Sequence, residues 1–469
     1  MMQYDYDVIV LGAGPAGESA ALNATKLNLK TAVIDNQNFV GGACTHKGTI
    51  PSKSLRRSVR DLMHFNNHPL LQRAVMNLDI SYPELLKDAN RVIDKQVQMR
   101  TGFYTRNRIA LIQGEGSFAD PHTLNIRHKN GDITNLSAKY FIIATGSRPY
   151  QPADIDFTHP RICDSDSILK MDYTPRKMII YGAGVIGCEY ASIFAGLNIR
   201  VDLLNTRDRL LEFLDDEITD ALGYQLSKYG CILRHNESYK KVTADDHGVT
   251  VELESGKRLH ADTFLWSNGR SGNTHTLNIE AAGLETNSRG QLSVNKEYQT
   301  NVEHIYAAGD VIGWPSLASA AYNQGMSATG YASGKEKHLF VKSVPTGIYT
   351  LPEISSVGKT ERELTEEKIP FEIGRAFFKD TAKAQISGDK VGMLKILFHS
   401  ETLQVLGVHC FGAEASEIIH IGQAIMKQKG EANTIEYFSE TTFNYPTMAE
   451  AYRIAALNGL NRIKGNAVY

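Results

Sequence analysis

The sequence is poor in cysteine and has no strong excess of charge of either sign. Its five cysteines are odd in number and widely scattered along 469 residues: Cys44, Cys163, Cys188, Cys231 and Cys410. This distribution argues against a disulfide framework and favours a reducing cytoplasm. The formal net charge of −2 gives no electrostatic basis for binding nucleic acid or an anionic membrane.

Long apolar runs are also absent. No run approaches the ~18 residues that a membrane-spanning helix needs, and the N-terminal residues 1–5 lack the basic and then apolar pattern of a secretion signal. With 42% hydrophobic and 22% charged residues, the composition is ordinary for a globular protein. Length alone suggests roughly three domains. We therefore expect a cytoplasmic protein that binds neither membranes nor nucleic acid, and we predict no metal site.

A glycine fingerprint occurs twice, each time after a short apolar run. Such a turn between a strand and a helix lets the backbone approach a pyrophosphate at the helix N-terminus. Two copies in register are far more specific than one, and they predict two dinucleotide-binding units. The glycines expected to contact the dinucleotides are Gly12, Gly14 and Gly17 in the first copy, and Gly182, Gly184 and Gly187 in the second.

The two copies differ at the end of the second strand. Twenty-three residues after its first glycine, the first copy has Asp35, followed by Asn36, whereas the second has Asn205. An acid at this position holds the ribose hydroxyls of adenosine. It would also repel a 2′-phosphate, because two like unit charges about 4 Å apart repel by about 4 kcal/mol at an effective dielectric constant of about 20. Asn205 removes this penalty and can still hydrogen-bond a hydroxyl.

Basic residues follow Asn205 closely: Thr206 precedes Arg207, and Arg209 comes two residues later. Their guanidinium groups could bind a phosphate, since a hydrogen bond to a charged group contributes about 1.5–3 kcal/mol. The alternative is that both arginines belong to a solvated loop. We predict that the second unit accepts NADPH and tolerates NAD(H).

The rest of the chain divides by its hydrophobic pattern. A mostly helical stretch is expected from Ser52 to about Arg106, broken at Pro69 and Pro83, and a helix is expected around residues 317–329. Short strands are expected at residues 110–113, 123–127 and 133–136, and a buried strand at 141–143 leads to a glycine turn. A second strand and turn at 264–270 repeats this arrangement. Beyond residue 345, alternating strands and helices without a fingerprint predict a separate α+β domain.

Residues 41–53, Gly-Gly-Ala-Cys-Thr-His-Lys-Gly-Thr-Ile-Pro-Ser-Lys, resemble the redox segment of the flavoprotein disulfide reductases, which include lipoamide dehydrogenase and glutathione reductase. The resemblance also covers both fingerprints, residues 144–146, residues 308–310 and the last domain. In that family two cysteines five positions apart form a reactive disulfide beside the flavin. This chain has Cys44 but carries Thr49 at the second position, and a hydroxyl cannot form a disulfide.

A second departure lies near the C-terminus. Where the family has a His-Pro pair followed by a glutamate, this chain has Tyr445, Pro446 and Glu450. An unperturbed phenol titrates near ~10 and an imidazole near ~6.5, so Tyr445 cannot shuttle protons at neutral pH as a histidine does. Both parts of the thiol chemistry are therefore missing, and disulfide substrates are not expected.

The resemblance implies roles for the residues that remain. Lys53 is expected to approach the reactive edge of the flavin and to pair with Glu189, and we count Tyr445 and Glu450 with them as catalytic candidates. Asp35 is expected to bind the adenosine ribose of FAD, and Asp310 its ribityl chain. A role for Cys44 as a small packing residue under the flavin is as well supported as a chemical role. Further cofactor contacts are expected at Gly41, Gly42, Ala43, Cys44, Thr145, Gly146 and Gly269.

The resemblance also implies the architecture: an α/β fold with two Rossmann-like domains, for FAD and NAD(P), and a C-terminal α+β dimerisation domain. We expect residues 1–150 and 276–344 to bind non-covalent FAD, residues 151–275 to bind NAD(P), and residues 345–469 to form the interface of a homodimer or larger assembly. The expected reaction is hydride transfer between NADPH and NAD⁺ through FAD. A flavin-dependent diaphorase that reduces quinones, or a non-catalytic redox sensor with Cys44 as its thiol, remains an alternative.

Overall fold

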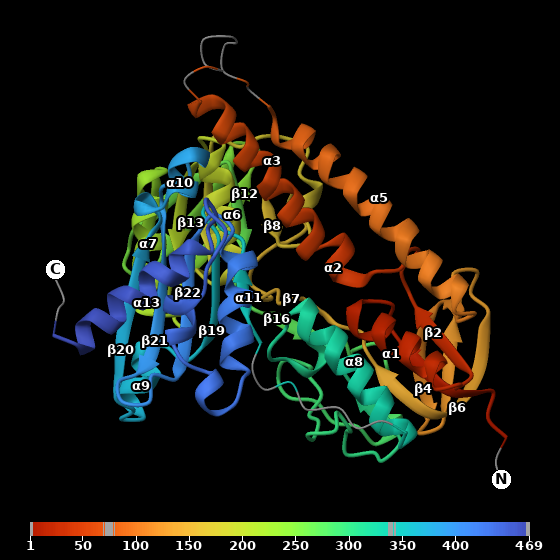
Figure 1. Ribbon diagram of the computed structural model, residues 1–469. Helices are drawn as coiled ribbons and strands as arrows, with labels where there is room; N and C mark the ends of the chain where they lie inside the picture. Colours follow the sequence, from red (N-terminus) through yellow and green to blue (C-terminus); the bar gives the residue numbers. More distant parts are fainter. Residues whose placement is uncertain are drawn as a thin grey trace.

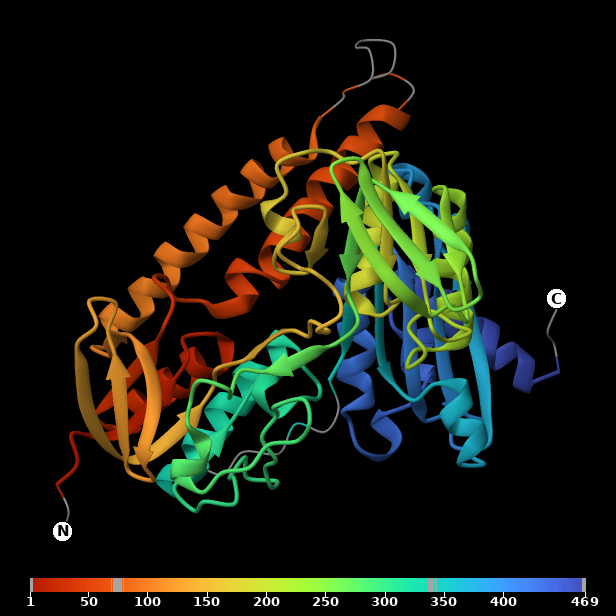
Figure 2. The same cartoon turned by 180° about the vertical axis from the view of Figure 1, so that it is seen from behind.

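The computed structural model describes residues 3–68, 70, 78, 80–335, 341 and 344–465. Figures 1 and 2 show one lobe built on the N-terminal sheet and a second in which a central and a C-terminal sheet pack together. The long helices α3 (Thr49–Asn67) and α5 (Tyr82–Arg106) run from the first lobe towards the second. Among the described helices, none combines the length and apolar character needed to cross a membrane.

The N-terminal sheet has a parallel core. β1 (Tyr6–Leu11) lies between β2 (Thr31–Asp35) and β6 (Ile133–Ile143), and β3 (Ala110–Gln113) and β17 (Ile305–Ala307) extend the parallel part. Buried Val, Ile and Ala residues fill these strands, as expected when helices cover a sheet. Helices α1 (Pro15–Lys26) and α8 (Ala318–Ser333) pack closely because alanine and glycine line their contact. A short α2 (Gly42–His46) follows β2, and β4 (Glu115–Asp120) and β5 (Thr123–Arg127) add an antiparallel edge.

Two expectations for this region were wrong in detail, and one strand was missed. Residues 133–136 and 141–143 are not separate strands, because the polar residues between them stay paired: β6 pairs antiparallel with β5 up to Ser137 and parallel with β1 from Ala138. Pro83 does not break a helix but lies in the first turn of α5, where a missing N–H is tolerated. Strand β4 was not predicted. Pro69 lies outside the described residues.

The central sheet repeats the parallel pattern in the order β11-β10-β9-β15-β8. Helix α6 (Val185–Gly196) follows β9 as α1 follows β1. β13 and β14 form a hairpin that turns around Ser255 and Gly256, and a short antiparallel ribbon of β7 and β16 joins this domain to the first. The bounds are β7 (Ser147–Pro149), β8 (Ile162–Asp164), β9 (Lys177–Tyr181), β10 (Arg200–Leu204), α7 (Asp216–Lys228), β11 (Cys231–Arg234), β12 (Tyr239–Asp245), β13 (Gly248–Leu253), β14 (Arg258–Ala261), β15 (Thr263–Trp266) and β16 (Arg270–Gly272).

The C-terminal sheet is antiparallel, in the order β18-β19-β22-β21-β20, and helices cover it. This arrangement confirms the expected α+β domain and, with the two parallel sheets, the predicted fold class. The bounds are β18 (Thr346–Ile348), β19 (Ile354–Gly358), α9 (Glu361–Glu366), β20 (Phe371–Phe377), α10 (Ala382–Ser387), β21 (Gly392–His399), β22 (Val405–Gly412), α11 (Ala415–Met426), α12 (Glu436–Glu440) and α13 (Glu450–Ile463), with short 3-10 turns at residues 168–170, 279–282, 310–312, 378–380 and 430–432.

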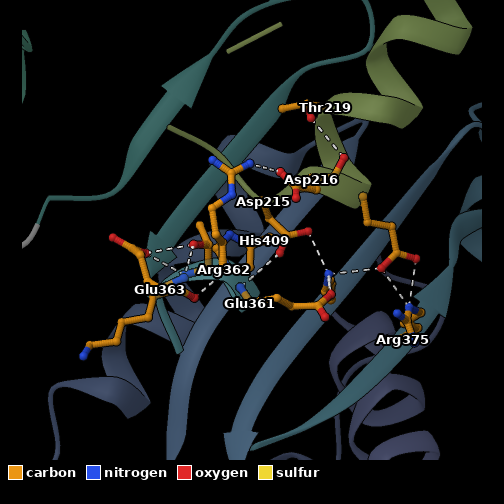
Figure 3. A network of polar contacts seen from close by, with 12 residues as sticks. Asp215, Asp216, Thr219, Glu361, Arg362, Glu363, Arg375 and His409 are labelled. Atoms are coloured by element: carbon orange, nitrogen blue, oxygen red, sulfur yellow. Dashed lines mark hydrogen bonds and ion pairs between the residues drawn. The ribbon is translucent and has the colours of Figure 1, made fainter. Parts of the chain in front are cut away.

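A buried lysine joins the central and C-terminal domains. Lys395 of β21 is fully buried, and its Nζ lies 2.7 Å from Asp215 Oδ1 and 3.1 Å from Glu217 Oε2, with Glu361 as a third partner. Burial opposes the charge on Lys395, yet these carboxylates raise its pKa. Burial likewise opposes the charge on Asp215, but His409 and Lys395 lower its pKa. Figure 3 shows Asp215 and Glu361 approaching each other from the two domains.

Replacing Lys395 with methionine is expected to lower the free energy of unfolding by about 3–5 kcal/mol, because Asp215 would stay buried without its cation. Chemical denaturation at pH 7 measures this loss, and the exposed Lys383→Met is the matched control. Because the pKa of Asp215 lies below its ordinary value, the contribution of the pair is present at neutral pH and is lost as the pH falls below about 4. An unchanged unfolding midpoint in Lys395→Met would show that the network does not stabilise the fold.

Candidate active site

The first fingerprint forms a tight turn between β1 and α1. Gly12 has a φ of +106°, and a Cβ atom there would lie 2.4 Å from the carbonyl oxygen of Ala144, so only glycine fits. A Cβ on Gly17 would lie 1.8 Å from the oxygen of Gly12. Because Gly17 has no side chain, α1 can start close to the sheet. Gly14 stands at the N-terminus of α1 and faces Gly42. The backbone is thus open to a large ligand at this helix end.

Asp35 ends β2 beside this turn. Its carboxylate accepts hydrogen bonds from the backbone N–H of Ala13 at 2.6 Å and of Gln37 at 2.7 Å, and burial raises the pKa of Asp35. The neighbouring Asn36 is exposed and accepts a hydrogen bond from the Gln37 side chain. The acid predicted to bind a ribose therefore lies directly against the glycine turn.

The segment containing Cys44 closes over the same turn. The N–H of Gly41 donates to the oxygen of Ala13 at 2.9 Å, and Gly42, Ala43 and Cys44 form the start of α2. Burial raises the pKa of the Cys44 thiol, and a hydrogen bond with the Thr49 hydroxyl opposes this shift without reversing it. Position 49 thus places a hydroxyl against the one thiol of this segment.

Two further predicted contacts lie at the ends of β6 and β17. Thr145 has a buried hydroxyl oxygen without a hydrogen-bond partner, and Gly146 follows with a φ of +69°. Asp310 begins the turn after β17, and its carboxylate accepts a hydrogen bond from the Ser147 hydroxyl at 2.8 Å. The turn of Gly12, Gly14 and Gly17, which we call the first cradle, fits the dinucleotide part of FAD together with Asp35 and the unpartnered hydroxyl of Thr145. The turn of Gly182, Gly184 and Gly187 is the second cradle.

Lys53 and Glu189 meet where three segments of the chain converge. Lys53 Nζ on α3 lies 2.7 Å from both carboxylate oxygens of Glu189 on α6. The backbone N–H of Tyr349, just after β18, donates to Glu189 Oε1 at 2.9 Å, and Lys53 Nζ lies 4.9 Å from the centre of the Tyr349 ring. Glu189 is buried, while the Lys53 side chain keeps 26% of its surface exposed. The pair therefore presents a fixed cation to an accessible space.

The second fingerprint repeats the geometry of the first. Gly182 has a φ of +104°, and a Cβ there would lie 2.8 Å from the oxygen of Ser267. A Cβ on Gly187 would lie 1.8 Å from the oxygen of Gly182, as at the corresponding position of the first copy. Nothing lies within 4 Å of a Cβ built on Gly184, so the N-terminus of α6 is open. Gly269 ends the turn after β15 with a φ of +97°.

Asn205 lies at the end of β10, matching the position of Asp35. Its side chain donates to the carbonyl oxygen of Arg209 at 2.6 Å and lies 3.3 Å from Nδ1 of His235. Its Oδ1 accepts a hydrogen bond from the backbone N–H of Arg207 at 3.3 Å. Thr206 is exposed. Asn205 thus sets the path of the loop that carries both arginines.

Both arginines of this loop are already paired with acids. Arg207 contacts Glu212, and Arg209 Nη1 lies 2.9 Å from Asp216 Oδ2. About two-fifths or more of each of these four side chains is exposed. The loop therefore carries positive charge that is balanced locally rather than free.

The C-terminal candidates are not joined to this centre within the described chain. Tyr445 is 71% exposed, and Glu450 begins α13. Among the described residues, no hydrogen bond or ion pair links either one to Lys53 or Glu189.

Several polar residues near the site escaped the sequence analysis. Arg100 on α5 is buried and lies 2.7 Å from a carboxylate oxygen of Glu18 on α1, and it also donates to the Tyr322 hydroxyl. Tyr349 and His235 were missed as well. Glu18 follows the last fingerprint glycine directly, which was the one local signal for a buried charge at the first turn.

Comparison with known proteins identifies relatives along the whole chain. The family "Pyridine nucleotide-disulphide oxidoreductase" matches residues 6–325, and the dimerisation domain of the same family matches residues 344–456. Soluble pyridine nucleotide transhydrogenases from Azotobacter vinelandii and Stutzerimonas stutzeri are 62% and 61% identical over 463 residues, covering 99% of this chain and 100% of each relative.

Solved structures show the same fold. The HOCl-induced flavoprotein disulfide reductase RclA from Escherichia coli aligns with a TM-score of 0.87 at 24% identity, over 96% of this chain and 99% of that one. LpdA from Mycobacterium tuberculosis aligns with a TM-score of 0.87 at 25% identity, over 96% and 98%. The chain belongs to the pyridine nucleotide-disulphide oxidoreductase family.

Proposed function

We propose that this chain is a soluble pyridine nucleotide transhydrogenase that moves hydride between NADPH and NAD⁺ with FAD as its cofactor. The observation that carries this proposal is the pairing of Cys44 with a hydroxyl at Thr49, beside an intact Lys53–Glu189 pair and two dinucleotide cradles. The parts that bind nucleotides are retained, while the second sulfur of a disulfide relay is absent. The full-length transhydrogenase relatives carry the same function in their names.

The residues divide the work between them. When bound, FAD supplies a ring that accepts hydride from one nicotinamide and returns it to another. Gly12, Gly14 and Gly17 would hold its pyrophosphate at the N-terminus of α1, and Asp35 would bind its adenosine ribose. Lys53, oriented by Glu189, would present a fixed positive charge to the bound cofactor and would favour negative charge on it.

Further residues of the first dinucleotide site contribute to FAD binding. Residues along the edge of the cradle complete the FAD site: Asn36, Gly41, Gly42, Ala43, Cys44, Thr145, Gly146 and Asp310. The second cradle holds either nicotinamide dinucleotide in turn, which allows one product to leave before the next substrate enters. Its contacts are Gly182, Gly184, Gly187, Asn205, Thr206, Arg207, Arg209 and Gly269. Because donor and acceptor share the same ring chemistry, little difference in binding between them is needed.

The domains follow from these roles. Residues 1–150 and 276–344 bind FAD, residues 151–275 bind NAD(P), and residues 345–469 carry the contacts between copies of the chain. The match to the dimerisation domain supports self-association, with a homodimer as the smallest assembly. Tyr445 is exposed in the single chain, which suits a position at the partner's site, and Glu450 accompanies it. The scarce and scattered cysteines suit a cytoplasmic location.

The sensor alternative is not favoured by the surroundings of Cys44. Burial raises the pKa of this thiol, so the reactive thiolate is scarce at neutral pH, and Thr49 provides no resolving sulfur. A diaphorase would pass electrons to a quinone instead of NAD⁺. The kinetics of flavin reoxidation by these two acceptors distinguish it from the proposal.

Sequential mixing under anaerobic conditions tests the function directly. NADPH is expected to remove the flavin absorbance, and NAD⁺ added afterwards is expected to restore it with formation of one NADH for each NADPH consumed. A flavin that a quinone reoxidises and NAD⁺ does not would identify a diaphorase. A yellow protein that NADPH does not bleach would indicate a non-catalytic role.

Glu189→Gln is expected to slow flavin reduction by NADPH about tenfold to a hundredfold. The substitution removes a charge-assisted contact that orients Lys53, and such a contact contributes about 1.5–3 kcal/mol. Single-turnover stopped-flow absorbance measures the rate, with FAD content determined for each variant. Glu353→Gln is the matched control, since Glu353 is also buried and pairs with Arg56 on α3. Equal rates in Glu189→Gln and the unaltered protein would remove Lys53 and Glu189 from the mechanism.

Arg207→Ala tests the position of the 2′-phosphate. We expect the Kd for NADPH to rise about tenfold, because a hydrogen-bonded charge contact is lost. The Kd for NADH should stay within a factor of about two, since NADH has no phosphate at this position. Equilibrium titrations at two salt concentrations measure both values. If the Kd for NADPH and its salt dependence are unchanged, the phosphate lies elsewhere.

A further inference from the structure

The arginines of the loop after β10 pair with acids that follow them in the chain. Arg207 and Arg209 supply two positive charges, and Glu212 and Asp216 pair with them. A phosphate monoester carries about −1.5 to −2 charge at pH 7 and seeks the same guanidinium groups. A 2′-phosphate at this loop would therefore compete with these carboxylates for the guanidinium groups, whereas a dinucleotide without the phosphate would not.

The two pairs are not equally free to open. Asp216 is contacted by Arg209 and also by Arg362 of α9, which approaches from the C-terminal domain (Figure 3). Arg209 Nη1 is itself buried. Arg362 also donates to the backbone oxygen of Glu212 at 3.3 Å and so ties this segment to the neighbouring domain. Asp216 and Arg209 are therefore held from several sides.

Arg207 and Glu212 are the adjustable pair. The Arg207 side chain is 64% exposed and that of Glu212 is 42% exposed, and the one ion pair that each makes among the described residues is with the other. Exposed ion pairs contribute about 0.2–1 kcal/mol, so a ligand phosphate can open this one. The competition lowers the advantage of NADPH without abolishing it, because specificity is a difference between two affinities.

We propose that Glu212 competes with the 2′-phosphate for Arg207 and thereby keeps NADPH and NADH binding comparable at one site. This inference rests on the proposed function, because a transhydrogenase must release NADP⁺ and admit NAD⁺ at the same cradle. Glu212 acts here as a specificity-determining residue through its effect on Arg207. Asp216, which contacts both Arg209 and Arg362, keeps Arg209 paired.

Glu212→Gln is the test, read as binding of NADP⁺ and NAD⁺ to the oxidised FAD-loaded protein by isothermal titration calorimetry. We expect the Kd for NADP⁺ to fall about two- to fivefold, the factor that corresponds to the loss of one exposed competing ion pair. The Kd for NAD⁺ should stay within a factor of about two, and the NADP⁺ affinity should depend more steeply on salt. Glu252→Gln is the matched control, because Glu252 forms a similar surface pair with Arg258 in the same domain.

The double variant Arg207→Ala, Glu212→Gln separates a specific competition from a general change in charge. If Glu212 acts through Arg207, Glu212→Gln has no effect on NADP⁺ binding once Arg207 is absent. The inference is overturned if Glu212→Gln tightens NADP⁺ and NAD⁺ equally, changes neither, or has the same effect in the Arg207→Ala background.

These titrations involve no turnover, so their outcome is independent of the reaction. Unchanged selectivity in a protein that still passes hydride from NADPH to NAD⁺ would refute the role of Glu212 and leave the proposed function intact. A changed selectivity in a protein that NAD⁺ cannot reoxidise would refute the proposed function instead.

Discussion

The ion pair between Lys53 and Glu189 is the contact on which the organisation of the active centre depends. Lys53 comes from the helix after the Cys44 segment, Glu189 from the helix of the second fingerprint, and the N–H that completes the carboxylate's hydrogen bonds comes from Tyr349 at the start of the C-terminal sheet. One buried carboxylate thus fixes three parts of the chain relative to one another. Since hydride transfer requires two rings at a defined separation, such a fixed junction is a precondition of the chemistry.

A second ionic centre lies at the boundary between the central and C-terminal domains. Lys395, fully buried among the carboxylates at the start of α7 and on α9, joins the central domain to the C-terminal domain. The same helix start carries Asp216, which holds Arg209 at the rim of the second cradle. The contacts at the domain boundary and the contact of Asp216 with Arg209, at the proposed phosphate subsite, therefore share the start of α7.

Local features of the site could be predicted from sequence, and long-range polar contacts could not. The glycine turns, the acid at position 35 and the hydroxyl at position 49 are determined by a few adjacent residues, and each lies where the spacing placed it. The Asp215–Lys395 bond joins residues 180 positions apart, and that between Arg100 and Glu18 joins residues 82 apart. In a sequence such residues look like ordinary solvated charges. Even the pairing of Arg207 with Glu212, five residues away, is not evident in the sequence, because it depends on the path of the loop.

The central claim is that electrons reside on the flavin alone, without a sulfur bridge. Anaerobic reductive titration of the FAD-loaded protein, followed by absorbance, tests this claim most directly. The account predicts complete reduction after one electron pair per FAD, with no charge-transfer band between a thiolate and the flavin. Uptake of a second electron pair, or the appearance of that band, would contradict it.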